Sequence, residues 1–169
     1  MKSYLISFIV IIIVFFIIPN VSVTKAVVII NDDVEPIPKR VVREIGVEEK
    51  IRTEFKNDNP KHWVALGKAE SRLQNISSKT DLMKDGRPFS SGIFMINLTV
   101  HNIGGLNCPN AFKGRNYKAV VINEKLYKQC IDAANDEDIN IKKANSIFKS
   151  QGKKAWGAYL NGSYLKHLK

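Results

Sequence analysis

The chain has few of the residue patterns that mark metal or nucleic-acid sites. Its three histidines, His62, His101 and His167, lie far apart, and none stands at ligand spacing from another histidine or from a cysteine, which argues against a zinc site. No arginine-rich or aromatic-interleaved segment of the kind that binds nucleic acid is present. Internal repeats are also absent, and no motif implies a cofactor. From these absences we expect neither a metal nor a cofactor, and no nucleic-acid partner.

Acidic residues are also scarce. The sequence has 16 Asp and Glu residues against 26 Lys and Arg residues, which gives a net charge of +10 at pH 7. Such a balance favours anionic partners: nucleic acid, anionic lipid or an acidic cell-wall polymer. Because the basic residues are dispersed along the chain, a solvated basic surface explains the charge equally well. The length of 169 residues suits one domain with a sizeable core and a targeting segment.

The first 26 residues have the features of an export signal. Lys2 precedes an apolar run from Tyr4 to Ile18, and the small residues Thr24 and Ala26 follow at the spacing of a cleavage site. We predict a signal peptide over residues 1–26, or an uncleaved anchor in the inner membrane, since the run is slightly shorter than a confident membrane span. In either case the following domain is exported to the periplasm or the extracellular space, and it meets the membrane only through this segment.

Residues 27–44 contain Pro36 and Pro38 and predict a linker or an arm, whereas residues 45–169 predict a single, mainly α-helical domain. Four-residue apolar spacing and capping residues locate its helices. We expect helices over 47–55, from Pro60 to about Leu73, from the cap Asn123 to Ala134, from Ile139 to Gln151, and, in shorter form, at Thr99 to Asn102 and Lys154 to Tyr159.

Two further local features are predicted between these helices. Asp85-Gly86 is the strongest turn signal in the chain, so residues 74–91 should form a small β-hairpin or loop. Cys108 and Cys130 are the only cysteines, and an even count in an exported chain predicts a disulfide between them. Two free, buried thiols are the alternative.

A single carboxylate interrupts an apolar helix face. Trp63, Leu66, Glu70 and Leu73 fall on one stripe of the helix that begins at Pro60, and Trp63 is expected to be a core anchor. Burying a charge is costly unless the charge is neutralised or paired. Glu70 is therefore either paired with a neighbouring lysine or arginine, or a carboxylic acid whose pKa is raised by its surroundings, so that it donates a proton at neutral pH. Periodicity leaves both interpretations open.

Three motifs in this order resemble a known family. They are A-E-S at residues 69–71, G-I-F-M-I-N at residues 92–97 after a polar loop, and the later Tyr159. Together they are similar to the motifs of the lysozyme-like superfamily, in its branch of soluble lytic transglycosylases and goose-type lysozymes, and the resemblance covers roughly residues 47–164. It implies a lysozyme-like helical domain with a small β-hairpin that cleaves the glycan strands of peptidoglycan, with Glu70 as the acid and Tyr159 close to it. The substrate groove that it implies is lined by Ser71, Ser91, Met95 and Asn97.

The resemblance leaves the second acid open. Glycosidases commonly use two carboxyl groups, and in chicken-type lysozymes the second one stands at the position that Ser90 occupies here. Asp81 and Asp85 are the remaining candidates, and both residues also suit turns. Lytic transglycosylases work with a single Glu, which protonates the glycosidic oxygen and then takes the proton of the muramoyl C6 hydroxyl, so that the sugar closes as an anhydro product.

The resemblance therefore predicts a lytic transglycosylase that cuts the β-1,4 bond between N-acetylmuramic acid and N-acetylglucosamine with Glu70 alone. A hydrolase of the same bond, with water positioned by Asp81 or Asp85, is the first alternative. The second is a catalytically silent peptidoglycan-binding component of an envelope apparatus, such as a secretion or conjugation machine. Two departures motivate this alternative: Met95 stands where the family has Gln, and Leu160 stands where it has Asn.

Overall fold

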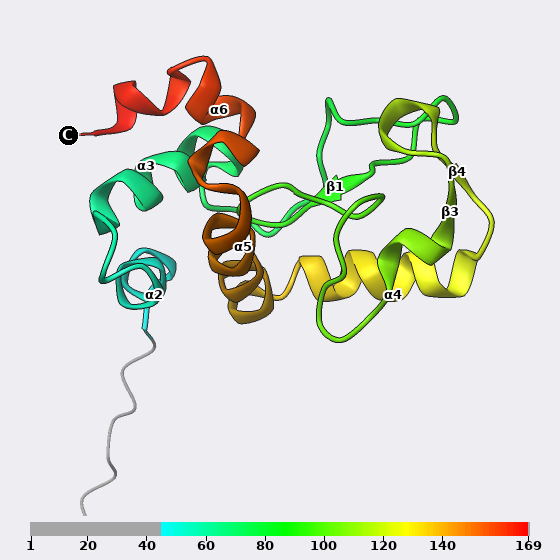
Figure 1. The fold of residues 1–169 in the computed structure, drawn as a ribbon, viewed down its shortest axis with the longest axis horizontal. Coiled ribbons are helices and arrows are strands. Elements are labelled where there is room, and N and C mark those ends of the chain that lie inside the picture. Colours follow the sequence, from blue (N-terminus) through cyan, green and yellow to red (C-terminus); the bar gives the residue numbers. More distant parts are fainter. Residues whose placement is uncertain (1–44, 169) are drawn as a thin grey trace, which may run out of the picture. The chain divides into compact units, whose positions relative to one another are not determined.

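The computed structural model describes residues 45–168 (Figure 1). These residues belong to one compact unit, Arg43–Lys169. The predictions for residues 1–26 and 27–44 lie outside the described residues. The described part is mainly helical and carries small two-stranded sheets, which confirms the predicted class. None of its helices is long and apolar enough to cross a bilayer.

The elements of the described residues follow one another in a simple order. The α-helices are α2 (Val47–Glu54), α3 (Pro60–Ser71), α4 (Glu124–Ala134), α5 (Glu137–Gln151) and α6 (Gly157–Leu160). The short 3₁₀ helices are η1 (Cys108–Ala111), η2 (Asn116–Lys118), η3 (Lys153–Ala155) and η4 (Ser163–His167). Strand β1 (Ser90–Ser91) pairs antiparallel with β2 (Ile96–Asn97), and β3 (Phe112–Lys113) pairs antiparallel with β4 (Val120–Val121).

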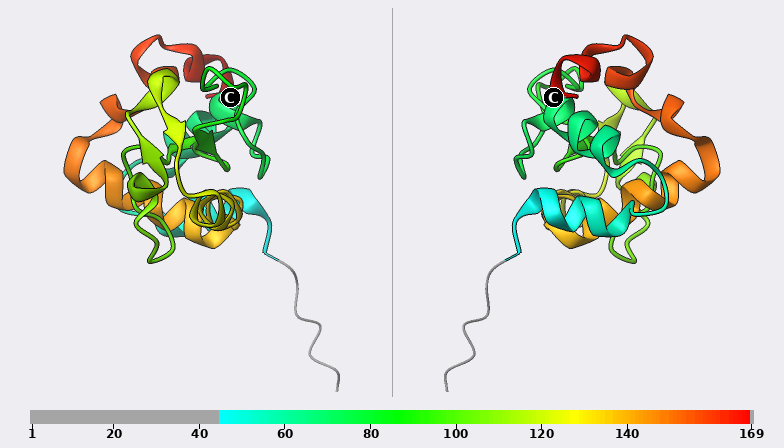
Figure 2. Two further views of the ribbon diagram at one scale, coloured as in Figure 1. Left: turned by 90° about the vertical axis from the view of Figure 1, so that its right-hand side faces the viewer. Right: turned by 90° about the vertical axis from the view of Figure 1, so that its left-hand side faces the viewer.

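The elements gather in two groups within the unit. Helices α2, α3, α5 and α6 lie together on the left in Figure 1, whereas α4 and the β3–β4 hairpin lie on the right. The β1–β2 hairpin and the loops that flank it run between the two groups. Figure 2 shows the β3–β4 hairpin at the front of its left view, with α4 seen nearly end-on.

Capping residues set the ends of the helices. Pro60 occupies the first turn of α3, as predicted, because a helix leaves its first N–H groups unpaired. The side chain of Asn123 accepts a hydrogen bond from the Leu126 amide at 3.1 Å, which confirms the predicted start of α4. Helix α5 begins two residues earlier than predicted, because Asp136 caps it by accepting from the Ile139 amide at 2.9 Å.

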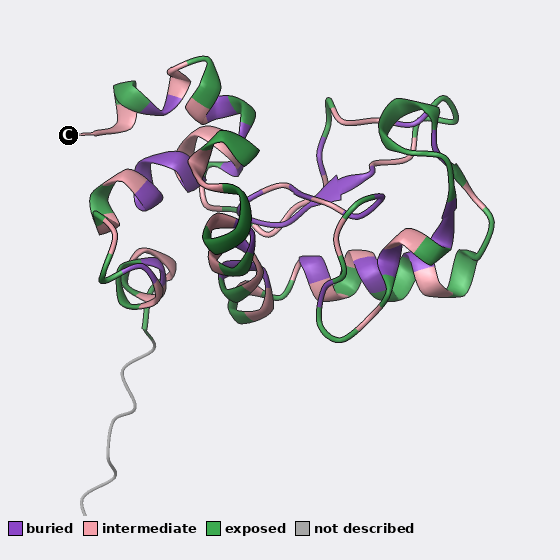
Figure 3. Ribbon diagram, in the orientation of Figure 1, coloured by how far each residue is buried: buried purple, intermediate pink, exposed green. Residues whose placement is uncertain are grey.

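The hydrophobic core is centred on Trp63, which is fully buried as predicted. Trp63 belongs to a run of buried residues in the middle of α3 (Figure 3). Phe55 stacks on its ring at a centroid distance of 3.9 Å, and Trp156 meets it edge-on at 5.2 Å. The indole Nε1 of Trp63 donates to Asp58 Oδ2 at 2.7 Å, and that of Trp156 donates to the carbonyl of Phe94 at 3.0 Å. Both indoles therefore contribute a large apolar surface without a buried, unpaired N–H.

A buried amide side chain fixes the turn between β1 and β2. Asn140 of α5 is completely buried; its Oδ1 accepts from the Phe94 amide at 3.0 Å, and its Nδ2 donates to the carbonyls of Ala134 and Ser91 at 2.8 and 3.2 Å. Gly92 lies in the same turn with φ +82°, and a Cβ there would overlap the Ala134 carbonyl oxygen and the Asn140 amide. The turn can approach the α4–α5 junction this closely only because residue 92 has no side chain.

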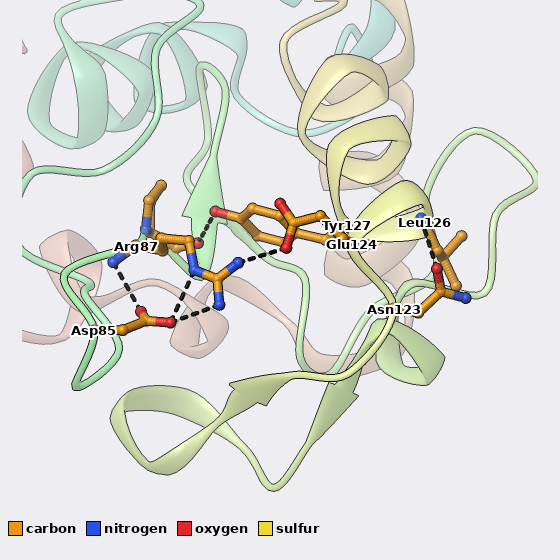
Figure 4. Close-up of polar contacts among 7 residues, drawn as sticks. Asp85, Arg87, Asn123, Glu124, Leu126 and Tyr127 are labelled. Atoms are coloured by element: carbon orange, nitrogen blue, oxygen red, sulfur yellow. Dashed lines mark hydrogen bonds and ion pairs between the residues drawn. The ribbon is translucent and has the colours of Figure 1, made fainter.

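The predicted turn at Asp85-Gly86 is present, in a hairpin closed by a single bridge between Leu82 and Pro88. Arg87 holds this loop against α4 (Figure 4). Its Nη2 contacts Asp85 Oδ2 at 2.6 Å and its Nη1 contacts Glu124 Oε2 at 2.7 Å. Nearby, the hydroxyl of Tyr127 donates to the carbonyl of Pro88 at 3.0 Å. The loop is therefore attached to a rigid element at its base.

Of two predicted short helices, one is wrong and the other is interrupted. Residues 99–102 begin in a turn and form no helix, because the side-chain oxygen of Asn97 accepts from both the amide and the hydroxyl of Thr99 at 3.0 and 2.7 Å and so competes with helical hydrogen bonds. The segment 154–159 is interrupted, because Trp156 is extended (φ −107°, ψ 132°) between η3 and α6.

The predicted disulfide is confirmed. Cys108 of η1 and Cys130 of α4 are bonded, with their Cα atoms 5.8 Å apart, and both are fully buried. The alternative of two free thiols is therefore wrong. The bond attaches the irregular segment between β2 and β3 to the middle of α4.

Candidate active site

Glu70 lies in the last turn of α3, half-buried, where the helix ends. The chain leaves the helix through Arg72 and Leu73, both with positive φ of 60° and 62°. Three residues before Glu70, a Cβ at Gly67 would come within 3.3 Å of the Ile93 side chain, so the glycine lets α3 approach the turn after β1 closely. This approach sets Glu70 beside the segment that leads from β1 to β2.

Glu70 has no cationic partner among residues 45–168. The lysine two residues before it, Lys68, binds Glu48 instead, at 2.6 Å. Of the two interpretations of Glu70, the ion pair with a neighbouring base is therefore wrong. The contact that Glu70 does make comes from the backbone of α6: the Ala158 amide donates to Glu70 Oε1 at 3.1 Å.

Burial raises the pKa of Glu70 above its ordinary value, the Ala158 amide opposes this by stabilising the carboxylate, and the negative charge of Asp81 raises the pKa further. A carboxyl group in these surroundings holds its proton to higher pH than an exposed one. Because the amide also stabilises the ionised form, Glu70 is suited to give up a proton and to take one back.

Glu70 lies where two surface cavities meet. The larger has a volume of about 700 Å³ and the smaller about 350 Å³, and both are lined by Ala69, Glu70, Thr80 and Met95. The larger cavity is lined mainly by polar residues, which include Asp81, Ser90, Asn97, Asn116, Tyr117, Asn161 and Ser163. A groove with many hydroxyl and amide groups on its walls suits a ligand that is itself rich in hydroxyl groups.

The residues predicted to line the groove are only partly brought together. Met95 and Asn97 line the larger cavity. Ser71 lines the smaller one, but its hydroxyl takes part in the end of α3 and accepts from the Gln74 amide at 3.1 Å. The predicted place of Ser91 in the groove wall is wrong: it lines neither cavity, and its hydroxyl donates to Asn135 Oδ1 at 2.8 Å. Ser90 lines the groove in its place, since successive residues of a strand face opposite sides.

Tyr159 stands one residue after the amide that contacts Glu70. The ring of Tyr159 stacks on Tyr164 at a centroid distance of 5.2 Å, and it lines neither cavity. Among the hydrogen bonds of the described residues, none joins it to Glu70. The residue next to it, Ala158, supplies the hydrogen bond to Glu70, and the supporting role expected for Tyr159 stays a prediction. The sequence could not reveal this, because the Ala158 donor is a backbone amide that any residue except proline carries.

The two candidates for a second acid differ in position. Asp81 lines the larger cavity together with Glu70, and its charge acts on the pKa of Glu70. Asp85 lines neither cavity, and Arg87 binds it and lowers its pKa. Only Asp81 is placed to act on a ligand in the groove.

Within residues 45–168 no cluster of three or more histidine, cysteine, aspartate or glutamate side chains could hold a metal ion. In comparisons with known proteins, no family model matches the chain, and neither a curated protein nor a solved structure matches it.

Proposed function

We propose that this protein is an exported, lysozyme-like glycosidase that cleaves the β-1,4 bond between N-acetylmuramic acid and N-acetylglucosamine in peptidoglycan, as a lytic transglycosylase. The observation that carries the proposal is the half-buried Glu70, with a raised pKa and no cationic partner among the described residues, at the junction of two polar cavities. A residue that only stabilised the fold would gain nothing from this arrangement, since burying an unpaired carboxyl group is unfavourable.

In the first step Glu70 acts as a general acid. Its carboxyl proton passes to the glycosidic oxygen as the bond from that oxygen to C1 of the muramoyl residue breaks, so the leaving sugar departs with a neutral hydroxyl. Burial raises the pKa of Glu70 and so favours the protonated form that this step needs. The Ala158 amide then stabilises the carboxylate that remains.

In the second step the same carboxylate acts as a base. It takes the proton of the C6 hydroxyl while that oxygen forms a bond to C1, which closes the anhydro ring and returns Glu70 to its protonated form. No water is consumed, and no second protein carboxyl group is needed. The position that carries the second acid in chicken-type lysozymes is Ser90, which lines the groove but cannot serve as a carboxylate.

A hydrolase of the same bond is the second candidate, because Asp81 lines the cavity together with Glu70. In that mechanism Asp81 would orient a water molecule or stabilise the positive charge that develops at C1. A silent peptidoglycan-binding component is the third candidate, motivated by Met95 and Leu160, but a binding protein has no need of an unpaired acid in its groove.

The experiment is mass spectrometry of the soluble products released when residues 27–169 digest purified peptidoglycan. Muropeptides that end in 1,6-anhydro-muramic acid would support the transglycosylase, and reducing ends would support the hydrolase. Asp81→Asn should spare the first activity and abolish the second, while Asp85→Asn, the same change outside the groove, should affect neither. Protein that sediments with the wall and releases nothing would indicate a binding component.

A further inference from the structure

The β3–β4 hairpin, residues 112–122, has an unusual charge for a segment beside a carbohydrate groove. It contains Lys113, Arg115 and Lys118 and no acidic residue. All three basic side chains are exposed, and none forms an ion pair with another residue in the range 45–168. Figure 3 shows the loop that joins the two strands in the colour of exposed residues. The hairpin is therefore a local concentration of uncompensated positive charge.

The inner face of this hairpin is already buried. Phe112 pairs with Val121 across the strands, and the ring of Phe112 packs edge-on against Tyr127 of α4 at a centroid distance of 5.7 Å. Phe112 is 6% exposed, and Val121 is half-buried against the core. These contacts account for the attachment of the hairpin to α4.

The outer face is apolar as well, although nothing in the described residues covers it. Val120 pairs with Lys113 across the strands, so both lie on the face opposite to Phe112. Val120 is 53% exposed, and Ile122, two residues further along, is 64% exposed. In a two-stranded sheet packed on one side, the solvent face is normally polar. Folding therefore does not explain Val120 and Ile122.

We infer that the outer face of the β3–β4 hairpin binds the surface of an anionic lipid bilayer. Aliphatic side chains flanked by Lys and Arg match the layered chemistry of such a surface, in which the apolar groups enter the acyl boundary and the cations meet the headgroup phosphates. Val120 and Ile122 are the apolar groups, and the basic residues of the hairpin are the cations.

The choice of a bilayer over another anionic partner rests on the side-chain types. Glycans and acidic peptides are recognised through hydrogen bonds and aromatic stacking, whereas Val120 and Ile122 offer branched aliphatic surface without polar atoms. The hairpin would thus be a second membrane contact, in addition to the one expected for residues 1–26. It would also orient the groove, because Asn116 and Tyr117 of the same hairpin line the larger cavity.

Binding to lipid vesicles tests whether the basic residues of the hairpin bind anionic headgroups. Residues 27–169, which contain the whole compact unit but not the apolar run at 4–18, are sedimented with vesicles of phosphatidylcholine, either alone or mixed with phosphatidylglycerol. Binding should require the anionic lipid and should weaken with added salt. Each basic residue at an anionic surface contributes about five-fold, so changing all three hairpin bases to Gln should weaken binding about a hundred-fold.

A matched control separates local from overall charge. Lys125, Lys128 and Lys149 are exposed, lie on α4 and α5, and form no ion pair with described residues. Changing these three to Gln removes the same net charge and should weaken binding by a much smaller factor. Equal loss in the two triple variants would overturn the inference, because it would mean that only net charge matters.

A second measurement tests insertion of the apolar side chains. Cys108 and Cys130 are bonded to each other, so Ile122→Cys provides a single thiol for an environment-sensitive fluorophore. The label should shift to the blue with phosphatidylglycerol vesicles, whereas a label at Lys149→Cys should not. The double change Val120→Thr and Ile122→Thr keeps β-branched residues in the strand and should weaken vesicle binding without unfolding the protein.

The outcomes are independent of the proposed enzyme activity. Glu70→Gln should bind vesicles as the unchanged protein does, so a failed digestion of peptidoglycan would leave this inference intact. An unshifted fluorophore at position 122 would refute the inference. Hairpin-dependent sedimentation with purified cell wall, without binding to vesicles, would refute it too and would assign the hairpin to an acidic wall polymer.

Discussion

Replacing Asn140 by alanine should remove a large part of the stability of the fold. The side chain makes three hydrogen bonds to the backbone at a site with 0% exposure, so alanine removes a hydrogen-bond partner from the Phe94 amide and from the carbonyls of Ser91 and Ala134. Each buried group of this kind costs about 1–3 kcal/mol. Allowing for water that enters the vacated space, we expect a loss of about 3–5 kcal/mol. This is a sizeable share of the roughly 5–15 kcal/mol that stabilises an ordinary domain.

The measurement is urea denaturation followed by far-ultraviolet circular dichroism. The midpoint should fall while the slope of the transition stays constant, because the surface exposed on unfolding hardly changes. Asn102 is exposed and forms no side-chain hydrogen bond with described residues, so Asn102→Ala is a suitable control and should lie within about 0.5 kcal/mol of the unchanged protein. A loss at position 140 of less than about 1 kcal/mol would mean that the amide is not needed to hold the turn.

The substitution Asn140→Asp should make the stability of the fold depend on pH. An ionised carboxyl group would face two carbonyl oxygens in a buried site, so the folded protein should favour the protonated form and raise the pKa of the introduced group. The folded state would then bind the proton more tightly than the unfolded state, and the free energy of unfolding should fall as the pH rises from about 4 towards neutrality. A stability that rose over this range would contradict the assignment of Asn140 Nδ2 as a double donor.

Three further predictions concern the acid, the turn and the disulfide. Glu70→Gln should lower the rate of peptidoglycan cleavage at least about a hundred-fold. The raised pKa of Glu70 makes its ionisation costly in the folded state, so the variant should also gain stability relative to the unchanged protein as the pH rises above the unfolded-state pKa. Thermal melts from pH 4 to 8 measure this difference. Gly92→Ala should prevent folding or destabilise strongly in the same urea assay, whereas Gly86→Ala, with the same φ of +82° but open space around it, should cost only about 1–2 kcal/mol. Changing Cys108 and Cys130 together to alanine should cost about 3 kcal/mol in urea for a sequence separation of 22 residues, and a cost near zero would mean that the fold constrains this loop without the bond.

Local rules in the sequence predicted several elements correctly. Apolar spacing predicted the helix over residues 47–55, Pro60 marked the first turn of α3, and Asn123 marked the start of α4. These predictions succeeded because a capping side chain or a proline acts within one helical turn of its own position. The burial of Trp63 followed from the same periodicity.

The failures involve contacts that no local pattern encodes. Ser90 and Ser91 are identical neighbours, and only the pairing of β1 with β2 decides which one faces the groove. A motif drew attention to Tyr159, whereas the hydrogen bond to Glu70 comes from the backbone amide of Ala158. The position of Glu70 on an apolar helix face could be predicted from the sequence, whereas the backbone amide that acts on its pKa could not.

The hydrogen bond from Ala158 to Glu70 has a consequence for the order in which the protein assembles. The two residues are 88 positions apart, and the segment 155–163 also supplies part of the wall of the larger cavity. While the chain is synthesised or crosses a membrane from its N-terminus, Glu70 emerges long before this segment. We therefore expect that a nascent chain ending at Gly152 can release no muropeptide from purified peptidoglycan, even though it contains the acid. An enzyme whose groove is completed only by its C-terminal segment would stay inactive until that segment had been synthesised and exported.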